Sequence, residues 1–275
     1  MKLEGKVAVV TGTSPNIGAG IAAAFADEAA RVVCVDVTAD NANQCAGWLK
    51  ERGAETMAVV CDTTIESQVE AMVTAVKEAF GGIDILVNNA GILGGMSVID
   101  MELERWQRQI AVNLTGTFLC TKHVAGLMVQ QGRRGNIINI VSTAGHQGQA
   151  GNIGYSTSKG GLLNFTRAAA MDLARYGIRV NSLTPTATDA SERRERMAAW
   201  GRPVPEPPAG RSGGNGMTDF ARFSPMGRLP GPRHYGRAAV FLASDDAEMI
   251  TGFDLRVDAG AIAKYWPWVP AEIQN

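Results

Sequence analysis

The sequence predicts an α/β protein in which a doubly wound parallel sheet carries helices on both faces and a lid follows the sixth strand. Short runs rich in β-branched residues alternate with longer amphipathic stretches along most of the chain, and such alternation is typical of a parallel sheet covered on both sides. A segment rich in proline and glycine, 186–225, breaks the alternation. The 275 residues are 45% hydrophobic, which is enough apolar material for a sizeable core.

Each element follows from this alternation. Strands are expected, in chain order, at 7–10, 31–35, 56–61, 83–87, 136–141, 178–183 and 253–257. Helices are expected at 17–30, 41–52, 65–80, 102–130, 155–176 and 233–242, with a shorter helix at 191–200 inside the lid. Because no linker interrupts the pattern, we expect one domain over residues 1–275, with a substrate lid at about 186–225 and an aromatic C-terminal tail at about 261–275.

Composition and charge favour a small molecule as partner and give no reason to expect nucleic acid or a membrane. The formal net charge is −1, so no broad field attracts polyanions. The N-terminus lacks the pattern of a secretory signal, and no apolar run approaches the roughly 18 to 20 residues that span a bilayer. Cys34, Cys45, Cys61 and Cys120 include no CxxC pair, so no metal site is expected. We therefore expect a cytoplasmic protein with reduced thiols.

The segment between the first strand and the first helix has the pattern of a dinucleotide-binding turn. It reads TGTSPNIG over residues 11–18. A tight glycine turn at this place points backbone N–H groups and the positive end of a helix at a pyrophosphate. The expected cofactor contacts in the turn are Gly12, Asn16, Ile17 and Gly18. Such turns also simply join strands to helices, so the turn needs support from its context.

Asp36 supplies that context. It ends the second expected strand, roughly 20 residues after the turn, where a carboxylate accepts hydrogen bonds from the adenosine ribose. The same charge repels a 2′-phosphate, and the following Val37 and Thr38 provide no arginine to bind one. The Rossmann-like fold is therefore expected to bind NAD in preference to NADP. A solvated carboxylate at a strand end is the alternative interpretation. Asp62, after the third strand, is expected to face the adenine.

An ordered set of motifs resembles the short-chain dehydrogenase/reductase family, in its single-domain form, over nearly the whole chain. The glycine turn is similar to the family's TGxxxGxG, and NNAG at 88–91 follows the fourth strand. Ser142 follows the fifth strand, and YSTSK at 155–159 matches the family's YxxxK. Asn113, Asn181 and the ITG at 250–252 also lie where members carry them. One YxxxK alone would be near chance, but the ordered set is specific.

Three positions depart from the family pattern. Asn16 stands where the family usually has its middle glycine, and asparagine tolerates left-handed backbone better than most residues. After the sixth strand, Pro185 is not followed by the usual glycine, and Thr188 is the nearest candidate for the threonine that contacts the nicotinamide region. Ala259 replaces a late glycine, a change that we interpret as packing.

The spacing of the YxxxK motif suits proton transfer. Tyr155 and Lys159 are i and i+4 on the expected helix, so their polar ends can approach one ligand. Free tyrosine titrates near pH 10, and a nearby ammonium would bring its pKa closer to neutrality. By resemblance, Tyr155 exchanges the proton with the substrate oxygen, Ser142 hydrogen-bonds the same oxygen, and Lys159 also holds the nicotinamide ribose. Asn113 is implied to steady a water that relays protons.

The resemblance also implies the remaining contacts and the assembly. The further cofactor contacts are Asn89, Ala90, Gly91, Tyr155, Lys159, Pro185 and Thr188. Family members commonly form tetramers, so a homotetramer or homodimer is expected. The implied reaction interconverts a secondary alcohol and a ketone. A catalytically silent NAD-binding regulator of the same fold is the alternative, and a sugar-nucleotide epimerase or dehydratase is disfavoured because those relatives usually have a longer chain.

The substrate is expected to lie between residues 93–96, the stretch 143–149 and the lid. His146 is a candidate for orienting it, although an exposed loop histidine is the commoner situation. The aromatic and methionine side chains expected in the lid are Met197, Trp200, Phe220 and Phe223. The lid arginines, which we interpret first as a solvated basic face and second as an anion site, are Arg193, Arg194, Arg196, Arg202 and Arg211. The tail sequence YWPW at 265–268 is expected to anchor to the domain body or to a neighbouring subunit.

Overall fold

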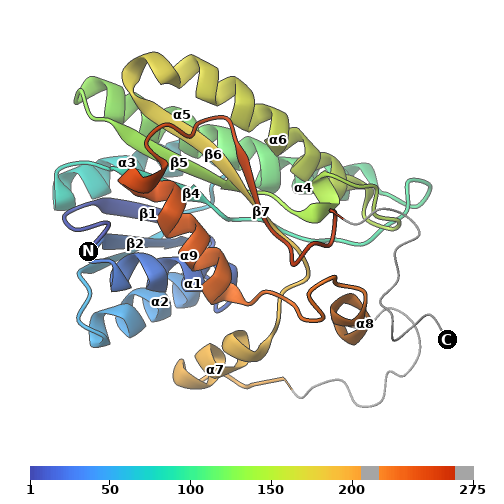
Figure 1. The fold of residues 1–275 in the computed structure, drawn as a ribbon. Helices are drawn as coiled ribbons and strands as arrows, with labels where there is room; N and C mark the ends of the chain where they lie inside the picture. The colour runs from blue at the N-terminus through green and yellow to red at the C-terminus, as the bar shows by residue number, and fades with distance from the viewer. Residues whose placement is uncertain (206–216, 264–275) are drawn as a thin grey trace.

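The computed structural model describes residues 1–205 and 217–263. Its centre is a seven-stranded sheet of order β3-β2-β1-β4-β5-β6-β7 (Figure 1). The strands are β1 (Val7–Thr11), β2 (Arg31–Asp36), β3 (Thr56–Val60), β4 (Ile85–Asn88), β5 (Gly135–Ile140), β6 (Ile178–Pro185) and β7 (Asp254–Val257). Every neighbouring pair runs parallel. The doubly wound parallel sheet predicted from the sequence is confirmed.

Helices cover both faces of the sheet (Figure 1). One face is covered by α1 (Ile17–Asp27), α2 (Ala39–Glu51) and α9 (Pro232–Ala243), which share an apolar cluster. The other is covered by α3 (Glu66–Phe80), α5 (Gly116–Gln130) and α6 (Ile153–Leu173). α4 (Leu103–Ile110) precedes α5, and the lid holds α7 (Ser191–Ala199) and α8 (Met217–Arg222).

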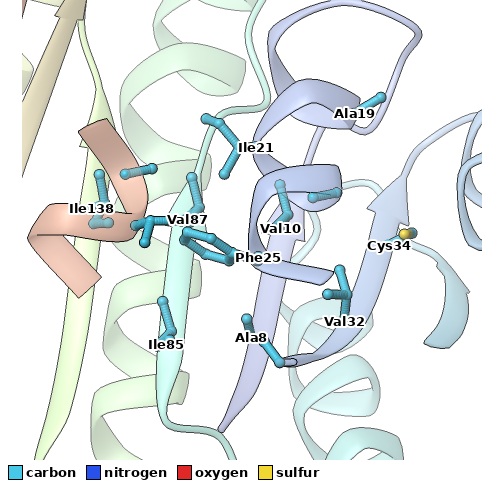
Figure 2. Packing of buried hydrophobic residues seen from close by; sticks show 14 of the residues in the cluster. Ala8, Val10, Ala19, Ile21, Phe25, Val32, Cys34, Ile85, Val87 and Ile138 are labelled. Carbon is cyan, nitrogen blue, oxygen red and sulfur yellow. The ribbon is translucent and has the colours of Figure 1, made fainter. Parts of the chain in front are cut away.

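The two apolar clusters follow the period of two that a strand imposes on its side chains. Along β1, Ala8 and Val10 face the α1 side while Val7 and Val9 face the α3 side, and all four are fully buried. Phe25 of α1 fills the first cluster, beside strand residues from β1 and β4 (Figure 2). Strands buried on both faces read as continuous hydrophobic runs, which is why these strands could be located from the sequence.

The order of the strands fixes where a ligand binds. From β1 the chain moves outward to β2 and β3, and then returns to β4 on the other side of β1. In open α/β sheets, ligands bind at such a reversal, outside the carboxyl ends of the strands. The segments that leave β1 and β4 are the glycine turn and the NNAG motif. The fold therefore brings both sequence motifs to the same crevice.

Two predicted elements differ from the structure. The single helix expected at 102–130 is interrupted by a π-helical turn, Ala111–Thr115, between α4 and α5. In the lid, the structure has a short helix, α8, that the sequence analysis did not predict. The glycine-rich stretch 210–216, Arg211 and the tail motif 265–268 lie outside the described residues.

The helices and the cysteines can be compared with what the composition predicts. Among residues 1–205 and 217–263, no helix has both the length and the apolar character needed to cross a bilayer. All four cysteines are free and buried, and burial raises the pKa of the Cys61 thiol to about 11. Thiols that stay protonated and inaccessible are inert packing groups.

Candidate active site

The glycine turn between β1 and α1 requires glycine at two positions. Gly12 has a φ of +71°, and a Cβ there would lie 2.7 Å from Cα of Ala90. A Cβ on Gly18 would lie 2.1 Å from the carbonyl oxygen of Gly12. Asn16, by contrast, has a φ of −122°, which lies outside the left-handed region, so its tolerance of left-handed backbone is not needed here. The replacement of a glycine by Asn16 leaves the turn intact.

The NNAG motif fixes the glycine turn through hydrogen bonds. The Asn89 amide nitrogen donates to the carbonyl oxygens of Thr11 at 3.0 Å and Gly12 at 2.8 Å. In return, the Thr11 hydroxyl accepts the backbone N–H groups of Asn89 and Ala90 at 3.0 and 3.1 Å. The motif therefore fixes the shape of the turn as well as lying beside it.

Asp36 is oriented at the end of β2 with one oxygen engaged and the other available. It is only 7% exposed. Its Oδ1 accepts the backbone N–H of Thr38 at 3.0 Å and the Asn41 amide at 3.1 Å. No donor from the described part of the chain reaches Oδ2. A carboxylate held in this way suits a ligand that donates from a diol. Asn41, five residues later on α2, was missed by the sequence analysis, although an asparagine at that spacing was a readable signal.

Asp62 lies at the carboxyl end of β3, on the same cleft. It accepts the hydroxyl of Thr64 at 2.7 Å and pairs with Arg108 at 3.8 Å. Burial raises the pKa of the Asp62 carboxyl, but the hydrogen bonds from Thr64 and the charge of Arg108 outweigh burial and lower it overall. Asp62 therefore stays ionised and paired. Arg108 is a second cleft residue that the sequence analysis missed.

Tyr155, Ser142 and Lys159 come together between β5 and α6. The Tyr155 hydroxyl forms a hydrogen bond with Ser142, whose side chain also accepts the backbone N–H of Ala144 at 3.2 Å. Lys159 is 4% exposed, and its Nζ lies 5.8 Å from the centre of the Tyr155 ring. Nζ donates to the carbonyl oxygen of Ile140 at 2.7 Å. The i, i+4 spacing on α6 thus places the phenol and the amine on one face, as the sequence indicated.

Burial dominates the electrostatics of this group. It raises the pKa of Tyr155, and the hydrogen bond with Ser142 lowers that pKa by less. It also lowers the pKa of the Lys159 amine to about 8, because a charged group loses its hydration inside the protein. The sequence-based expectation that Lys159 brings the Tyr155 pKa toward neutrality is therefore not met by the chain's own contacts. The Lys159 charge is instead directed at Ile140.

Asn113 sits in the π-helical turn between α4 and α5 and is fully buried. Its Oδ1 accepts the backbone N–H of Ile92 at 2.8 Å, and its Nδ2 donates to the carbonyl of Ile92 at 3.1 Å and to Ser158 at 3.0 Å. A Cβ on Gly91 would meet Asn113 Oδ1 at 3.3 Å and Lys159 Nζ at 3.5 Å. Asn113 therefore clamps the segment after β4 onto α6, immediately behind Lys159.

These groups surround one cleft of about 890 Å³. All residues expected to contact a cofactor line it: Gly12, Asn16, Ile17, Gly18, Asp36, Asp62, Asn89, Ala90, Gly91, Tyr155, Lys159, Pro185 and Thr188. Ser142 lines it as well, whereas Asn113 stands behind the wall. The cleft continues past Tyr155 toward the lid, where the lining includes Leu93, Thr143, Gln147, Gln149 and Phe220.

Two residues proposed for the substrate side point elsewhere. The His146 ring contacts Asp254 Oδ2 at 3.1 Å and the Thr184 hydroxyl at 3.2 Å, away from the cleft, so it joins the loop after β5 to β6 and β7. The expectation that His146 orients a substrate is wrong for this arrangement. Trp200 of the lid is 8% exposed and belongs to the core. Sequence alone could not show these orientations, because both residues follow elements whose rotation is set by tertiary contacts.

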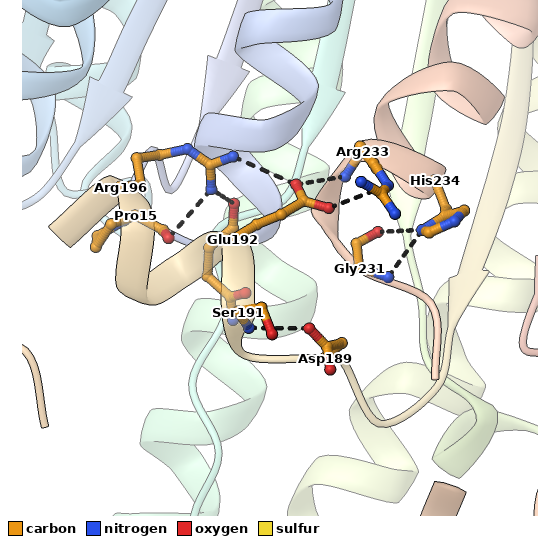
Figure 3. A network of polar contacts seen from close by, with 9 residues as sticks. Pro15, Asp189, Ser191, Glu192, Arg196, Gly231, Arg233 and His234 are labelled. Atoms are coloured by element: carbon orange, nitrogen blue, oxygen red, sulfur yellow. Dashed lines mark hydrogen bonds and ion pairs between the residues drawn. The ribbon is translucent and has the colours of Figure 1, made fainter. Parts of the chain in front are cut away.

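The lid helix α7 is fixed to the glycine turn by a buried arginine (Figure 3). Arg196 is 8% exposed, and its Nη1 donates to the carbonyl oxygens of Pro15 and Asn16, both at 3.3 Å. Glu192 pairs with Arg196 at 3.6 Å and accepts the backbone N–H of Arg233 at 3.0 Å. The first interpretation of the lid arginines as a solvated face is therefore wrong for Arg196, which connects the lid to the glycine turn.

A second contact ties the end of the lid helix to α2. The rings of Trp200 and Trp48 meet edge to face with centroids 6.4 Å apart. Arg202 stacks on Trp200 at 5.1 Å and donates to Oδ1 of Asn41 at 2.8 Å. Since Asn41 also donates to Asp36, one chain of hydrogen bonds runs from the lid to the carboxylate at the end of β2.

Fold and site together define a nucleotide-dependent oxidoreductase of the short-chain type, and comparison with known proteins agrees. The family model described as short chain dehydrogenase matches residues 6–200. This chain belongs to the short-chain dehydrogenase/reductase family.

Relatives with named activities match nearly the whole chain. Galactitol 2-dehydrogenase of Agrobacterium fabrum is 36% identical over 94% of this chain and 98% of its own. D-threitol dehydrogenase of Mycolicibacterium smegmatis is 36% identical over 96% of this chain and 95% of its own. Among solved structures, an NAD⁺-bound xylitol dehydrogenase is 31% identical and has a TM-score of 0.83. The match covers 94% of this chain and 99% of that chain.

Proposed function

We propose that this oxidoreductase interconverts a secondary alcohol and a ketone with NAD as cofactor and Tyr155 as the general acid and base. The observation that carries the proposal is the buried phenol of Tyr155, hydrogen-bonded to Ser142 and flanked by the Lys159 amine, on the wall of the cleft that begins at the glycine turn. A proton donor, a second hydroxyl and a cation next to one surface are the groups that carbonyl reduction needs.

The cleft fits a dinucleotide on two independent observations. The turn packs so closely on itself and on the NNAG motif that neither Gly12 nor Gly18 can carry a Cβ, and both glycines line the cleft. At the other end, Asp36 keeps Oδ2 available for a ribose diol, and its charge disfavours a 2′-phosphate. These observations support NAD over NADP. The NAD⁺-bound xylitol dehydrogenase neighbour supports the same preference.

The chain's own groups divide the chemistry. When bound, the nicotinamide supplies or accepts the hydride. Tyr155 holds the proton that is given to the carbonyl oxygen or taken from the alcohol. Ser142 hydrogen-bonds the same oxygen and orients it toward Tyr155. Lys159 would hold the nicotinamide ribose, and Asn113 keeps the segments around Lys159 in place.

Polyols are the substrate class that the cleft supports best. Beyond Tyr155, its lining offers the Thr143 hydroxyl and the amides of Gln147 and Gln149, which can donate to and accept from several hydroxyl groups. The galactitol, threitol and xylitol dehydrogenases named above are relatives that act on such compounds.

Substitution of Tyr155 by phenylalanine tests the assignment. The variant lacks only the transferable proton, so NADH absorbance should show loss of turnover in a polyol panel while NADH binding by fluorescence stays near the wild-type value. Turnover of the variant at the wild-type rate would refute the role of Tyr155. If the wild-type protein binds NADH tightly but turns over no member of a panel of polyols, cyclic alcohols and hydroxy acids, the regulator becomes the better assignment.

The same proposal includes the organisation of the chain. We expect residues 1–275 to act as one cytoplasmic domain and to assemble as a homotetramer or homodimer. Phe118 on α5 and Met171 on α6 are 46% and 68% exposed, and exposed apolar side chains on neighbouring helices are typical of subunit contacts. Light scattering after gel filtration measures the assembly, and a monomer at all concentrations would contradict this part.

A further inference from the structure

The lid helix α7 presents one face to the glycine turn. Residues three apart on a helix share a face, and Ala190, Arg193 and Arg196 are spaced in this way. Arg196 reaches the carbonyl oxygens of Pro15 and Asn16, which fixes that face against the turn. One step nearer the cleft, Ala190 and Arg193 both line the cavity.

Arg193 is a cation without an internal partner at this place. Among the residues that the structure describes, three positively charged side chains line the cleft. Arg108 pairs with Asp62 at the adenine end, and Lys159 donates to Ile140 at the other end. Within residues 1–205 and 217–263, Arg193 forms no ion pair or hydrogen bond. The adjacent carboxylate of Glu192 is already occupied by Arg196 and Arg233.

The turn itself supplies no charged side chain for a pyrophosphate. From Gly12 to Ala26 the sequence has neither lysine nor arginine, and Asn16 makes no side-chain hydrogen bond at the start of α1. Backbone N–H groups and the helix end attract an anion, but a pyrophosphate carries two negative charges. A guanidinium offers several donors in a geometry that suits phosphate oxygens.

We propose that Arg193 is a cofactor-binding residue that pairs with the pyrophosphate of the dinucleotide, so that α7 contributes a side chain to the phosphate site. This inference rests on the proposed function, because it requires a dinucleotide in the cleft. It assigns Arg193 to the cofactor and not to an acidic substrate. The hydrogen bonds from Arg196 to Pro15 and Asn16 then hold α7 close enough to the turn for Arg193 to reach the ligand.

Binding measurements with truncated ligands test the proposal without relying on turnover. Arg193→Met removes the charge and keeps an unbranched side chain, and Arg193→Lys keeps the charge without the planar group. Arg194→Met is the matched control, because Arg194 lies on the same helix, carries the same charge and does not line the cleft. Dissociation constants for NADH, ADP-ribose and adenosine are measured by calorimetry for all four proteins.

The expected pattern is specific to the phosphates. Arg193→Met should weaken the binding of NADH and ADP-ribose by about tenfold, which is the usual effect of losing a charge-assisted contact. The affinity for adenosine should stay unchanged. Arg193→Lys should recover part of the loss, and Arg194→Met should bind all three ligands like the wild type. The loss for Arg193→Met should shrink as salt increases.

Each other outcome has a definite meaning. If Arg193→Met binds NADH and ADP-ribose like the wild type, the inference is overturned while the proposed function stands. Equal losses for Arg193→Met and Arg194→Met would overturn it too, because they would show a general charge effect. If the wild-type protein binds neither NADH nor NADPH, the proposed function fails and the role of Arg193 fails with it.

Discussion

Replacing Lys159 by methionine should stabilise the cofactor-free protein. Burial lowers the pKa of the Lys159 amine from 10.5 to about 8. One pKa unit corresponds to about 1.4 kcal/mol, so a charged amine at this site lowers the free energy of unfolding at pH 7 by up to about 3 kcal/mol. Methionine removes the charge but also the hydrogen bond to Ile140, worth about 1 kcal/mol. We expect a net gain of about 2 kcal/mol at pH 7, together with loss of turnover.

The pH dependence separates this cause from ordinary repacking. Between pH 8 and 10.5 the unfolded chain binds the Lys159 proton and the folded protein does not. The stability of the wild type relative to the variant therefore rises with pH, and the advantage of Lys159→Met shrinks toward pH 10.5. Urea unfolding at fixed protein concentration, at pH 7 and pH 9.5, measures the difference.

Lys122→Met provides a control of opposite sign. The Lys122 ammonium is exposed and bonds Glu66 at 2.6 Å, and this hydrogen bond raises its pKa. Any stabilisation from Lys122 is fully present below pH 10.5 and is lost above it, so its removal should not stabilise the protein at pH 7. An unfolding midpoint of Lys159→Met at or below that of the wild type at pH 7, or a difference unchanged at pH 9.5, would refute the argument.

Three further substitutions test the proposed cofactor contacts and the anchoring of the lid. Asp36→Ala should weaken the binding of NADH by about tenfold, because charge-assisted contacts are lost, and should reduce the preference of the protein for NADH over NADPH. An unchanged preference for NADH in a fluorescence titration would contradict the ribose contact. Gly18→Ala should abolish measurable NADH binding because its Cβ would lie 2.1 Å from a carbonyl oxygen, whereas Gly47→Ala on α2, where a Cβ meets nothing within 4 Å, should bind normally. Trp200→Ala should lower the free energy of unfolding by about 3 kcal/mol because it empties a buried site, and a wild-type urea midpoint would show that the lid is not anchored there.

The sequence predicted the sheet and the cleft well because both depend on local patterns. Buried parallel strands are short β-branched runs, and the glycine turn, Asp36 and the YxxxK motif each follow a strand or open a helix. Once the strand order is fixed, the ends of β1, β2 and β4 must meet. The cofactor contacts expected from the sequence therefore all line one cleft.

The lid could not be predicted in the same way. Its arginines are alike in sequence, yet Arg196 is buried against the glycine turn, Arg202 donates to Asn41, and Arg193 faces the cleft. What separates them is the rotation of α7, which depends on contacts with residues 161 and 181 positions away. The π-helical turn around Asn113 has a similar origin, because the widened turn is matched by tertiary hydrogen bonds to Ile92.

The position of the lid and the orientation of Asp36 depend on one shared side chain, Asn41. Asn41 donates to Asp36 through its nitrogen and accepts Arg202 through its oxygen. An amide with both ends occupied cannot flip without losing one partner, so Arg202 fixes which end of Asn41 faces Asp36. If Asn41 turned its oxygen toward Asp36, two acceptors would face each other and the carboxylate would rotate away from its present direction. The lid therefore contributes to the orientation of Asp36, the group that we propose selects the cofactor, even though Arg202 itself does not line the cleft.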